Sequence, residues 1–380
     1  MFFILSLGPI LHFNGIITKN VEGLNYVIPL PYILIMNIPI ISIARVPARW
    51  DVLVMLSLAV LAGYGLHYIF SKYDGQSFRN ISKNNVIGVI LAAIIIFEFL
   101  AIPFPMSNTT TTIPVFYNQI ANDTDNYAIL EIANKYDIAD LMYYQTIHNK
   151  KLVNGYASRT PESATKFMTS TPMITQLLSP SDSLIPEGDI MAQNLTDVGS
   201  SILSYYDIRY VVLHAARISD KQLNYKNTLL QESITQEPQR FKNDNIIVYK
   251  VENVPRKSFI LLNEGWYGIE NASGTPKRWM NSNATMLFYS DQNRTTTLSM
   301  EVSSFYRPRT LDISVADQRE LHVTVPTEFV MITLPFDLHK GENIIRFNTP
   351  DSCQKPSAIP EVNSPDSRCL SIAVQNITFS

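Results

Sequence analysis

The densest run of side chains that could bind a sugar or a phosphate lies at residues 142–161, which read MYYQTIHNKKLVNGYASRTP. Tyrosine offers a stacking face and a hydroxyl, while amide, imidazole and guanidinium groups bind hydroxyls or phosphate oxygens. The candidate binding residues of this run are Tyr143, Tyr144, Gln145, His148, Tyr156 and Arg159. The alternative is a loop that packs on its own domain and satisfies its polar groups locally.

Two arginines stand immediately before a long apolar stretch. Arg45 and Arg49 lie in the sequence ARVPARW, with Pro47 between them. A guanidinium group keeps its charge and can bind a phosphate through two parallel hydrogen bonds, so the pair could bind a lipid-linked phosphate. Equally, the two side chains could extend to lipid headgroups, or pair with Asp51.

Aromatic residues form a third set of candidates. Trp266, Tyr267 and Trp279 could form a platform on which a carbohydrate stacks. Residues of these types are more often found in the core or at the edge of a β-sandwich, and that alternative stays open.

Several kinds of chemistry are excluded. The sequence contains no G-x-S-x-G elbow, P-loop, Rossmann fingerprint or H-E-x-x-H motif. Its six histidines lack the spacing of a metal site, so we expect no metal and no evident cofactor. Asp123-Thr124-Asp125 has the D-x-D pattern of many glycosyltransferase sites, but we interpret it as a solvated turn. The net charge of −3, without any block of Lys or Arg, argues against nucleic acid as a partner.

The two cysteines, Cys353 and Cys369, lie 16 residues apart near the C-terminus. Because no C-x-x-C or Cys/His cluster occurs, a structural zinc site is not expected. In an exported domain an isolated pair predicts a disulfide, worth roughly 3 kcal/mol for a loop of that length. The alternative is two buried thiols.

The elements that hold these residues begin with a hydrophobic N-terminal quarter, residues 1–104. Two stretches, 52–70 and 86–104, are apolar enough and, at about 19 residues each, long enough to cross a hydrocarbon core of ~30 Å. Two further apolar stretches, 2–18 and 26–44, are less regular. Prolines interrupt the second of them, which predicts a broken or re-entrant helix.

The loop between the two regular stretches sets the expected topology. Residues 71–85 carry Lys72, Arg79 and Lys83, and an excess of positive charge predicts a cytoplasmic position. The region after residue 105 is then extracytoplasmic, in a multi-pass protein of the cell membrane. Seven N-x-S/T sequons after that residue agree only weakly, because Asn80 begins another one in the loop.

The extracytoplasmic region has two patterns. Residues 113–255 alternate between strand and helix patterns, which predicts an α/β unit. Its expected strands are 127–132, 210–214 and 245–251, and its expected helices are 161–178 and 219–232, with the end of a further helix at 202–206. Residues 257–380 carry short stretches of alternating apolar residues between turns, which predicts a jelly-roll-like β-sandwich. The expected fold class is therefore a membrane α-helical N-terminal segment, an α/β unit and a β-sandwich.

Three segments carry a resemblance to a known family. LGPILHFNG, IPLPYILIMNIPIISIARVPARWDVLVMLSLAVLAGYGL and YYQTIHNKKLVNGYASRTP resemble the C-terminal part of polytopic glycosyltransferases of the GT-C superfamily. The likeness is to archaeal and bacterial members with a C-terminal extracytoplasmic domain, and it spans roughly residues 6–160. YDIRYVVLH and GENIIRF give weaker support.

The resemblance implies transfer of a sugar from a polyprenyl-phosphate donor during assembly of cell-surface glycan. The resemblance is also the only reason to expect a divalent cation. The catalytic acidic residues of such enzymes lie in the first external loop, to which nothing in this chain corresponds. No catalytic residue can therefore be assigned, and whether the chain is an enzyme stays open. Further transmembrane segments or a partner subunit would have to supply that loop.

Two functions are expected from these observations. The first is the membrane-proximal and extracytoplasmic part of a GT-C-like glycosyltransferase, with membrane lipid and polyprenyl-phosphate sugar as partners. The alternative is a non-enzymatic, membrane-anchored module of the cell envelope that binds surface carbohydrate or an envelope protein.

Overall fold

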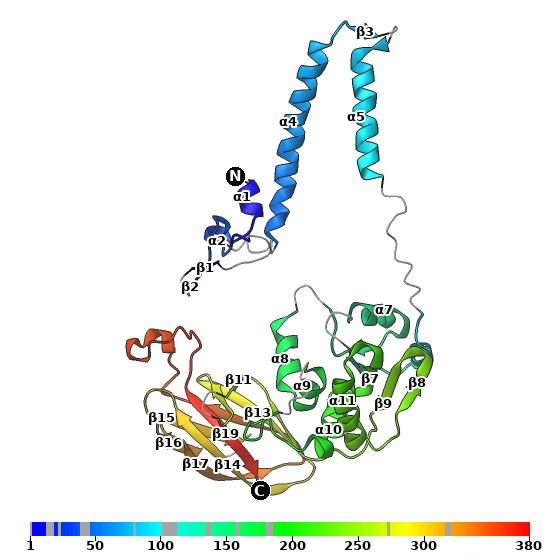
Figure 1. Ribbon diagram of the computed structural model, residues 1–380. Coiled ribbons are helices and arrows are strands. Elements are labelled where there is room, and N and C mark those ends of the chain that lie inside the picture. Colours follow the sequence, from blue (N-terminus) through cyan, green and yellow to red (C-terminus); the bar gives the residue numbers. More distant parts are fainter. Residues whose placement is uncertain are drawn as a thin grey trace. The chain divides into compact units, whose positions relative to one another are not determined.

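The computed structural model describes most of the chain (Figure 1). The described residues are 2–12, 19–21, 24–38, 46–78, 81–100, 112–133, 138–156, 160–179, 185–271, 274–315 and 321–380. The chain divides into two compact units, Met1–Thr110 and Thr111–Ser380.

Two long apolar helices dominate the N-terminal unit. They are α4 (Asp51–Lys72), which continues the 3-10 helix η1 (Pro47–Trp50), and α5 (Lys83–Phe99). Pro47 suits the first turn of a helix because its missing N–H needs no partner there. Asp51 in the first turn of α4 and Lys72 in its last turn complement the helix dipole. The expected helix at 52–70 is therefore confirmed.

Only one helix in the described ranges is long and apolar enough to cross a membrane. It is the 26-residue span Pro47–Lys72, none of which is buried. The expected helix at 86–104 is present in α5 up to Phe99, but α5 has 17 residues and residues 101–104 lie outside the described ranges. A multi-pass arrangement therefore stays a prediction.

The other elements of this unit are short. They are α1 (Phe2–Ser6), β1 (Lys19–Val21), β2 (Leu24–Tyr26), α2 (Tyr32–Ile35), β3 (Ser77–Phe78) and β4 (Ile81–Ser82). The apolar stretches 2–18 and 26–44 thus contain only α1 and α2 as described helices, and residues 13–18 and 39–44 lie outside the description.

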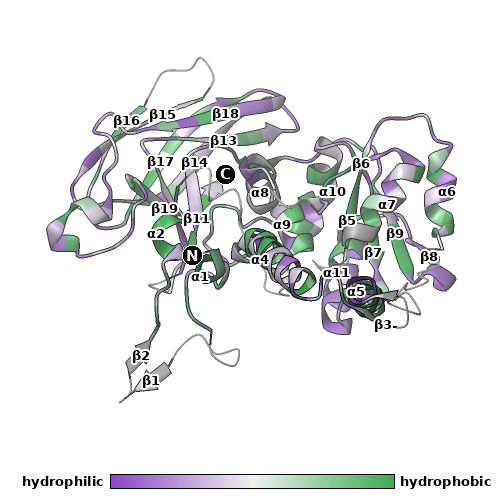
Figure 2. Ribbon diagram, turned by 90° about the horizontal axis from the view of Figure 1, so that it is seen from above, coloured by the Kyte–Doolittle hydropathy of each residue, from purple (hydrophilic) through white to green (hydrophobic). Residues whose placement is uncertain are grey.

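The C-terminal unit begins with a five-stranded sheet in the order β6-β5-β7-β9-β8. Its strands are β5 (Ala128–Ile132), β6 (Lys151–Leu152), β7 (Ile208–His214), β8 (Gln239–Phe241) and β9 (Ile246–Lys250). Strands β6, β5 and β7 are parallel, and β9 runs antiparallel to β7 and β8. The central strands are mostly buried on both faces, as expected of strands covered on both sides, and β9 is hydrophobic along most of its length (Figure 2).

Helices cover both faces of this sheet. Residues of α6 (Val115–Ala121) and α7 (Ile138–His148) share one apolar core with the strands. Residues of α9 (Pro172–Leu178), α10 (Leu195–Tyr205) and α11 (Asp220–Ser233) share another. The expected α/β architecture is confirmed.

One expected helix is divided in two. The stretch 161–178 forms α8 (Glu162–Ser170) and α9, separated at Thr171. Because Pro172 disfavours helical geometry in the residue before it, Thr171 is extended, and α8 ends there.

The second half of the unit is a sandwich of two five-stranded antiparallel sheets, in the orders β10-β13-β18-β15-β16 and β11-β12-β19-β14-β17. The strands of the first sheet are β10 (Phe259–Leu262), β13 (Asn283–Ser290), β18 (Gly341–Asn348), β15 (Arg309–Val315) and β16 (Leu321–Val325). Those of the second are β11 (Trp266–Glu270), β12 (Lys277–Met280), β19 (Ile372–Phe379), β14 (Arg294–Ser304) and β17 (Val330–Leu338). Alternate residues such as Leu298, Met300 and Val302 fill the core between the sheets, which confirms the expected sandwich.

The two halves of the C-terminal unit share their cores. Ile190 and Met191, from the segment before α10, pack into the sandwich core. Phe259 and Leu261 of β10 pack into the core formed by α9, α10 and α11. Because each half buries residues of the other, the α/β half and the sandwich form one packed body.

Candidate functional site

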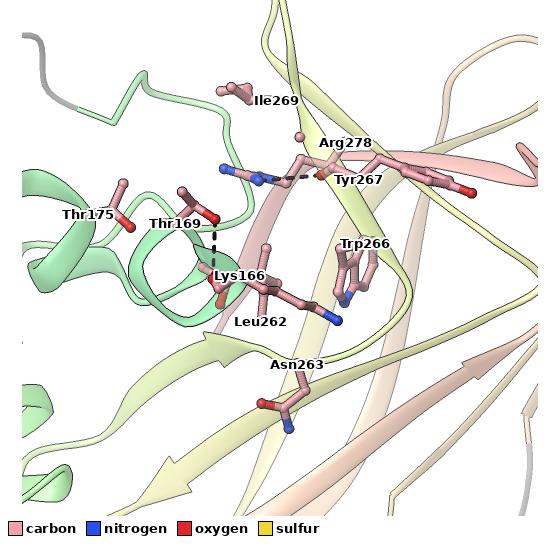
Figure 3. Close-up of a pocket in the computed structure, with 11 residues that line it drawn as sticks. Lys166, Thr169, Thr175, Leu262, Asn263, Trp266, Tyr267, Ile269 and Arg278 are labelled. Atoms are coloured by element: carbon pink, nitrogen blue, oxygen red, sulfur yellow. Dashed lines mark hydrogen bonds between the residues drawn. The ribbon is translucent and has the colours of Figure 1, made fainter. Parts of the chain in front are cut away.

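A pocket of about 290 Å³ lies between the α8–α9 segment and strand β11 (Figure 3). Its lining residues come from both halves of the unit and are Lys166, Thr169, Ser170, Thr175, Leu262, Asn263, Trp266, Tyr267, Gly268, Ile269 and Arg278. The lining combines an aromatic ring with hydroxyl, amide and ammonium groups.

A tight turn places Trp266 at this pocket. Gly265 has a φ of +84°, and a Cβ at this position would lie 1.9 Å from the carbonyl oxygen of Asn283. Only glycine fits such a turn. The indole N–H of Trp266 donates to the Thr285 carbonyl at 2.8 Å, and its ring packs edge-on against Phe347 at 5.4 Å. These contacts hold one edge of the ring in the sandwich, while the residue stays partly exposed.

Two polar side chains at the pocket are free to bind. The backbone N–H of Asn263 donates to the Thr285 carbonyl at 3.0 Å, which fixes the position of the residue. Within the described ranges, neither the Asn263 side-chain amide nor the Lys166 ammonium group forms a hydrogen bond or an ion pair. The Thr169 hydroxyl donates within α8, to the carbonyls of Thr165 at 3.0 Å and Lys166 at 3.2 Å, so its oxygen remains an acceptor.

Arg278 contributes a second basic group, but its charge is already paired. Its Nε and Nη2 atoms donate to the two carboxylate oxygens of Asp189 at 2.6 and 2.8 Å, and its Nη1 donates to the Tyr267 carbonyl at 3.4 Å. The arginine side chain is 11% exposed and the aspartate side chain is fully buried. This bidentate pair forms a rigid wall of the pocket.

The aromatic platform expected from Trp266, Tyr267 and Trp279 does not form as one surface. Successive residues of a strand point to opposite faces, so Trp266 faces the sandwich core while Tyr267 faces away from it. The Tyr267 hydroxyl exchanges hydrogen bonds with the backbone N–H and carbonyl of Cys369, both at 3.2 Å. Figure 3 shows the Tyr267 ring pointing away from the pocket. Trp279 is buried beside it and donates to Glu270 at 3.1 Å.

The binding run expected at 142–161 is likewise divided. Tyr143 and Tyr156 are exposed, whereas Tyr144 and His148 are buried. The latter two lie four residues apart on α7, on the face that packs on the sheet. Gln145 donates to the Lys150 carbonyl at 3.0 Å, as the alternative of local satisfaction requires. Arg159, the last candidate of the run, lies outside the described ranges.

Tyr144 and His148 flank a buried polar network that sequence reasoning missed. The Tyr117 ring stacks on both, with ring centroids 4.7 Å from Tyr144 and 5.4 Å from His148. Its hydroxyl donates to the Glu131 oxygens at 2.9 and 3.1 Å, and His214 Nε2 lies 2.8 Å from Oε2 of the same carboxylate. The signal was present in the sequence, since a glutamate interrupts the apolar strand YAILEI and a histidine ends YVVLH.

The network lies at the carboxyl ends of β5 and β7. After β5 the chain adds β6 on one side of that strand, and it later adds β7 on the other side, so the strand order reverses at this point. Ligands of open α/β sheets commonly bind at such a switch point. Tyr117, Glu131 and His214 are nevertheless buried, and burial together with the Glu131 charge raises the pKa of the Tyr117 hydroxyl. The tyrosine therefore stays protonated as a donor, and we interpret the network as a structural one.

The remaining expectations concern the arginine pair, the disulfide and metal binding. Arg49 lies exposed in η1, and Arg45 is outside the described ranges. Cys353 and Cys369 form the expected disulfide, with their Cα atoms 5.2 Å apart. In the part of the chain that the structure describes, no three His, Cys, Asp or Glu residues are placed to hold a metal ion.

The D-x-D motif forms a turn. The Asp125 N–H donates to Asp123 Oδ1 at 2.9 Å, and Arg209 pairs with Asp125 at 2.8 Å. A hydrogen bond from a backbone N–H to the side chain of an aspartate two residues earlier, like that between Asp125 and Asp123, is typical of turns.

No protein-family model matches the chain, and no curated protein matches it. Similar solved structures include the CBM35 from Cellvibrio japonicus Abf62, at 14% identity and a TM-score of 0.21, over 33% of this chain and 96% of that one. A family 35 carbohydrate binding module from Clostridium thermocellum is similar at 17% identity and a TM-score of 0.22, over 32% of this chain and 91% of that one. Likeness at these levels assigns neither a family nor a ligand to this chain.

Proposed function

We propose that the C-terminal unit is a glycan-binding module and that the N-terminal helices anchor it at a membrane. The observation that carries the proposal is the pocket in which Trp266 lies beside the unpaired Asn263 amide and Lys166 ammonium groups. Sugars present C–H faces that pack on aromatic rings, and hydroxyls that both donate and accept hydrogen bonds. The lining therefore matches a sugar better than it matches a purely apolar ligand.

The size and rigidity of the pocket also suit a small glycan unit. Its volume of about 290 Å³ is near the lower end of the roughly 300–1,000 Å³ typical of ligand pockets. The Gly265 turn, the Trp266 hydrogen bond and the Arg278–Asp189 pair hold its walls before any ligand binds. A preformed site loses less entropy on binding, which favours affinity.

The composition of the described pocket lining supports sugar binding more than it supports sugar transfer. None of the described residues that line the pocket is Asp or Glu. Glycosyl transfer needs a carboxylate or a comparable group as base or nucleophile at the reacting carbon. The GT-C activity implied by the resemblance therefore stays a prediction, and so does a polyprenyl-phosphate partner.

Membrane anchoring is supported by the exposed apolar surface of α4. Leu58, Leu61 and Tyr64 are 53–72% exposed, and no residue of α4 is buried. A surface of this kind is stable in lipid or against other transmembrane helices, but not in water. Alkaline carbonate extraction of membranes should leave the chain in the pellet, and its release into the supernatant would contradict anchoring.

A glycan array probed with the full chain in detergent tests the proposal, followed by calorimetry on the oligosaccharides that bind. We expect Asn263→Ala to weaken binding about three- to ten-fold, as the loss of one hydrogen-bonding group predicts. Asn243→Ala, at an exposed position in the 3-10 helix before β9, is the matched control and should bind normally. Absence of any bound glycan, or wild-type affinity in Asn263→Ala, would overturn the proposal.

A further inference from the structure

The charges around the pocket are unbalanced. Lys166 and Arg278 are the basic residues among its eleven lining residues, and no described lining residue is acidic. The two cations differ, however, in what already neutralises them.

The Arg278 charge is matched inside the protein. The Asp189 carboxylate, which is fully buried, accepts hydrogen bonds from the Nε and Nη2 atoms of Arg278 at 2.6 and 2.8 Å. Such a pair presents almost no net charge to a ligand.

Among the described residues, Lys166 has no such partner. Within the described chain its ammonium group makes no ion pair, although Glu162 lies four residues earlier on the same helix. The residue is partly buried and points from α8 toward the wall that carries Trp266 and Asn263 (Figure 3). One uncompensated positive charge therefore remains at the pocket, in surroundings where protein has replaced part of the water.

From this we infer that the glycan bound here carries an anionic group, which the Lys166 ammonium group binds. The inference rests on the proposed glycan-binding function and adds the class of sugar. Opposite charges attract more strongly near a protein wall than in bulk water, and hydrogen bonds between charged partners are roughly twice as strong as neutral ones. A lysine acts as a compact point charge, so its chemistry suits a carboxylate as well as a phosphate ester.

Matched pairs of probes separate charge from the rest of the sugar. Calorimetry on the full chain in detergent compares a galactose oligosaccharide with a galacturonate oligosaccharide, and glucose with glucose 6-phosphate. We expect at least one acidic member to bind about ten-fold more tightly than its neutral partner at low salt. The preference should shrink as the ionic strength rises, because salt screens the charges. The two pairs show whether the anion is a carboxylate or a phosphate.

Variants of α8 assign the preference to one side chain. Lys166→Gln should abolish the acidic preference, whereas Lys166→Arg should retain it. Glu162→Gln should strengthen acidic binding slightly, and Lys151→Gln, at an exposed site in β6, should change nothing. Equal binding of neutral and acidic probes, or a preference that survives in Lys166→Gln, would overturn the inference while glycan binding itself stands. Absence of any bound glycan, on the array as well as among these probes, would instead overturn the proposed function.

Discussion

The ion pair between Asp189 and Arg278 makes the most direct energetic test of how the C-terminal unit is assembled. Asp189 belongs to the segment that inserts Ile190 and Met191 into the sandwich, and Arg278 lies on β12. The carboxylate is fully buried and the guanidinium group is 11% exposed. Asp189→Asn removes the charge but keeps one carbonyl oxygen as an acceptor, so it leaves a nearly buried cation without its counterion.

Breaking a buried ion pair by removing one partner destabilises a protein by about 3–5 kcal/mol. Because the asparagine retains one hydrogen bond, we expect the lower end, about 3 kcal/mol. For a domain of this size, 1 kcal/mol shifts the melting temperature by roughly 2–4 °C, so the expected decrease is about 6–12 °C.

A second ion pair between the same two halves provides the control. Asp197 of α10 pairs with Lys257, just before β10, and these side chains are 50% and 60% exposed. Exposed pairs contribute about 0–1 kcal/mol, so Asp197→Asn should shift the melting temperature by no more than about 4 °C.

Intrinsic fluorescence during heating measures both variants, because two of the three tryptophans, Trp266 and Trp279, lie in the sandwich. Equal shifts in Asp189→Asn and Asp197→Asn would refute the reasoning. That result would mean that burial of the Asp189 carboxylate does not determine the strength of its pairing.

Three further predictions follow from single sites. Reduction of the Cys353–Cys369 disulfide, or Cys353→Ser with Cys369→Ser, should lower stability by roughly 3 kcal/mol in urea unfolding, and an unchanged midpoint would contradict this. Gly265→Ala should abolish glycan binding, because its Cβ would lie 1.9 Å from the Asn283 carbonyl oxygen; calorimetry checks this, and normal affinity would contradict it. Burial lowers the pKa of His148 below its ordinary 6.5, so the unfolded chain takes up a proton first as the pH falls. Stability should therefore decrease as the pH falls below about 6.5, and it should decrease less steeply in His148→Gln. If the urea midpoints of the two proteins fall equally steeply between about pH 7 and 5, the prediction is wrong.

Periodicity in the sequence predicts most of the architecture. The period-2 pattern of Leu298, Met300 and Val302 is enough to place one face of β14 in a core, because strand side chains alternate. A long apolar run likewise predicts α4, since no charged residue lies between Val52 and Phe70. These features depend on neighbours in the sequence, which a single chain displays.

The pocket could not be predicted in the same way. Asp189 and Arg278 are 89 residues apart, and Lys166 and Asn263 come from different halves of the unit. No local pattern marks such residues as neighbours, because tertiary packing alone brings them together. The run 142–161 is a candidate by composition, but the four-residue spacing of Tyr144 and His148 already places them on one helix face. That this face is buried is known only from the structure.

The network around Tyr117 allows a final test, of whether its hydroxyl supports the buried Glu131 carboxylate. Tyr117→Phe removes the donor that lies 2.9 and 3.1 Å from the two carboxylate oxygens and leaves His214 Nε2 at 2.8 Å. The ring volume is kept, so the change isolates the hydroxyl. An acceptor that loses a partner inside a protein costs about 1–3 kcal/mol, and we expect a loss in that range in urea unfolding. In a Glu131→Leu background no carboxylate remains to be satisfied, so the same tyrosine substitution should cost much less. The difference between the two measurements is the coupling energy of the pair. If Tyr117→Phe costs the same in both backgrounds, the hydroxyl does not act through Glu131, and the network is held together by stacking and burial alone.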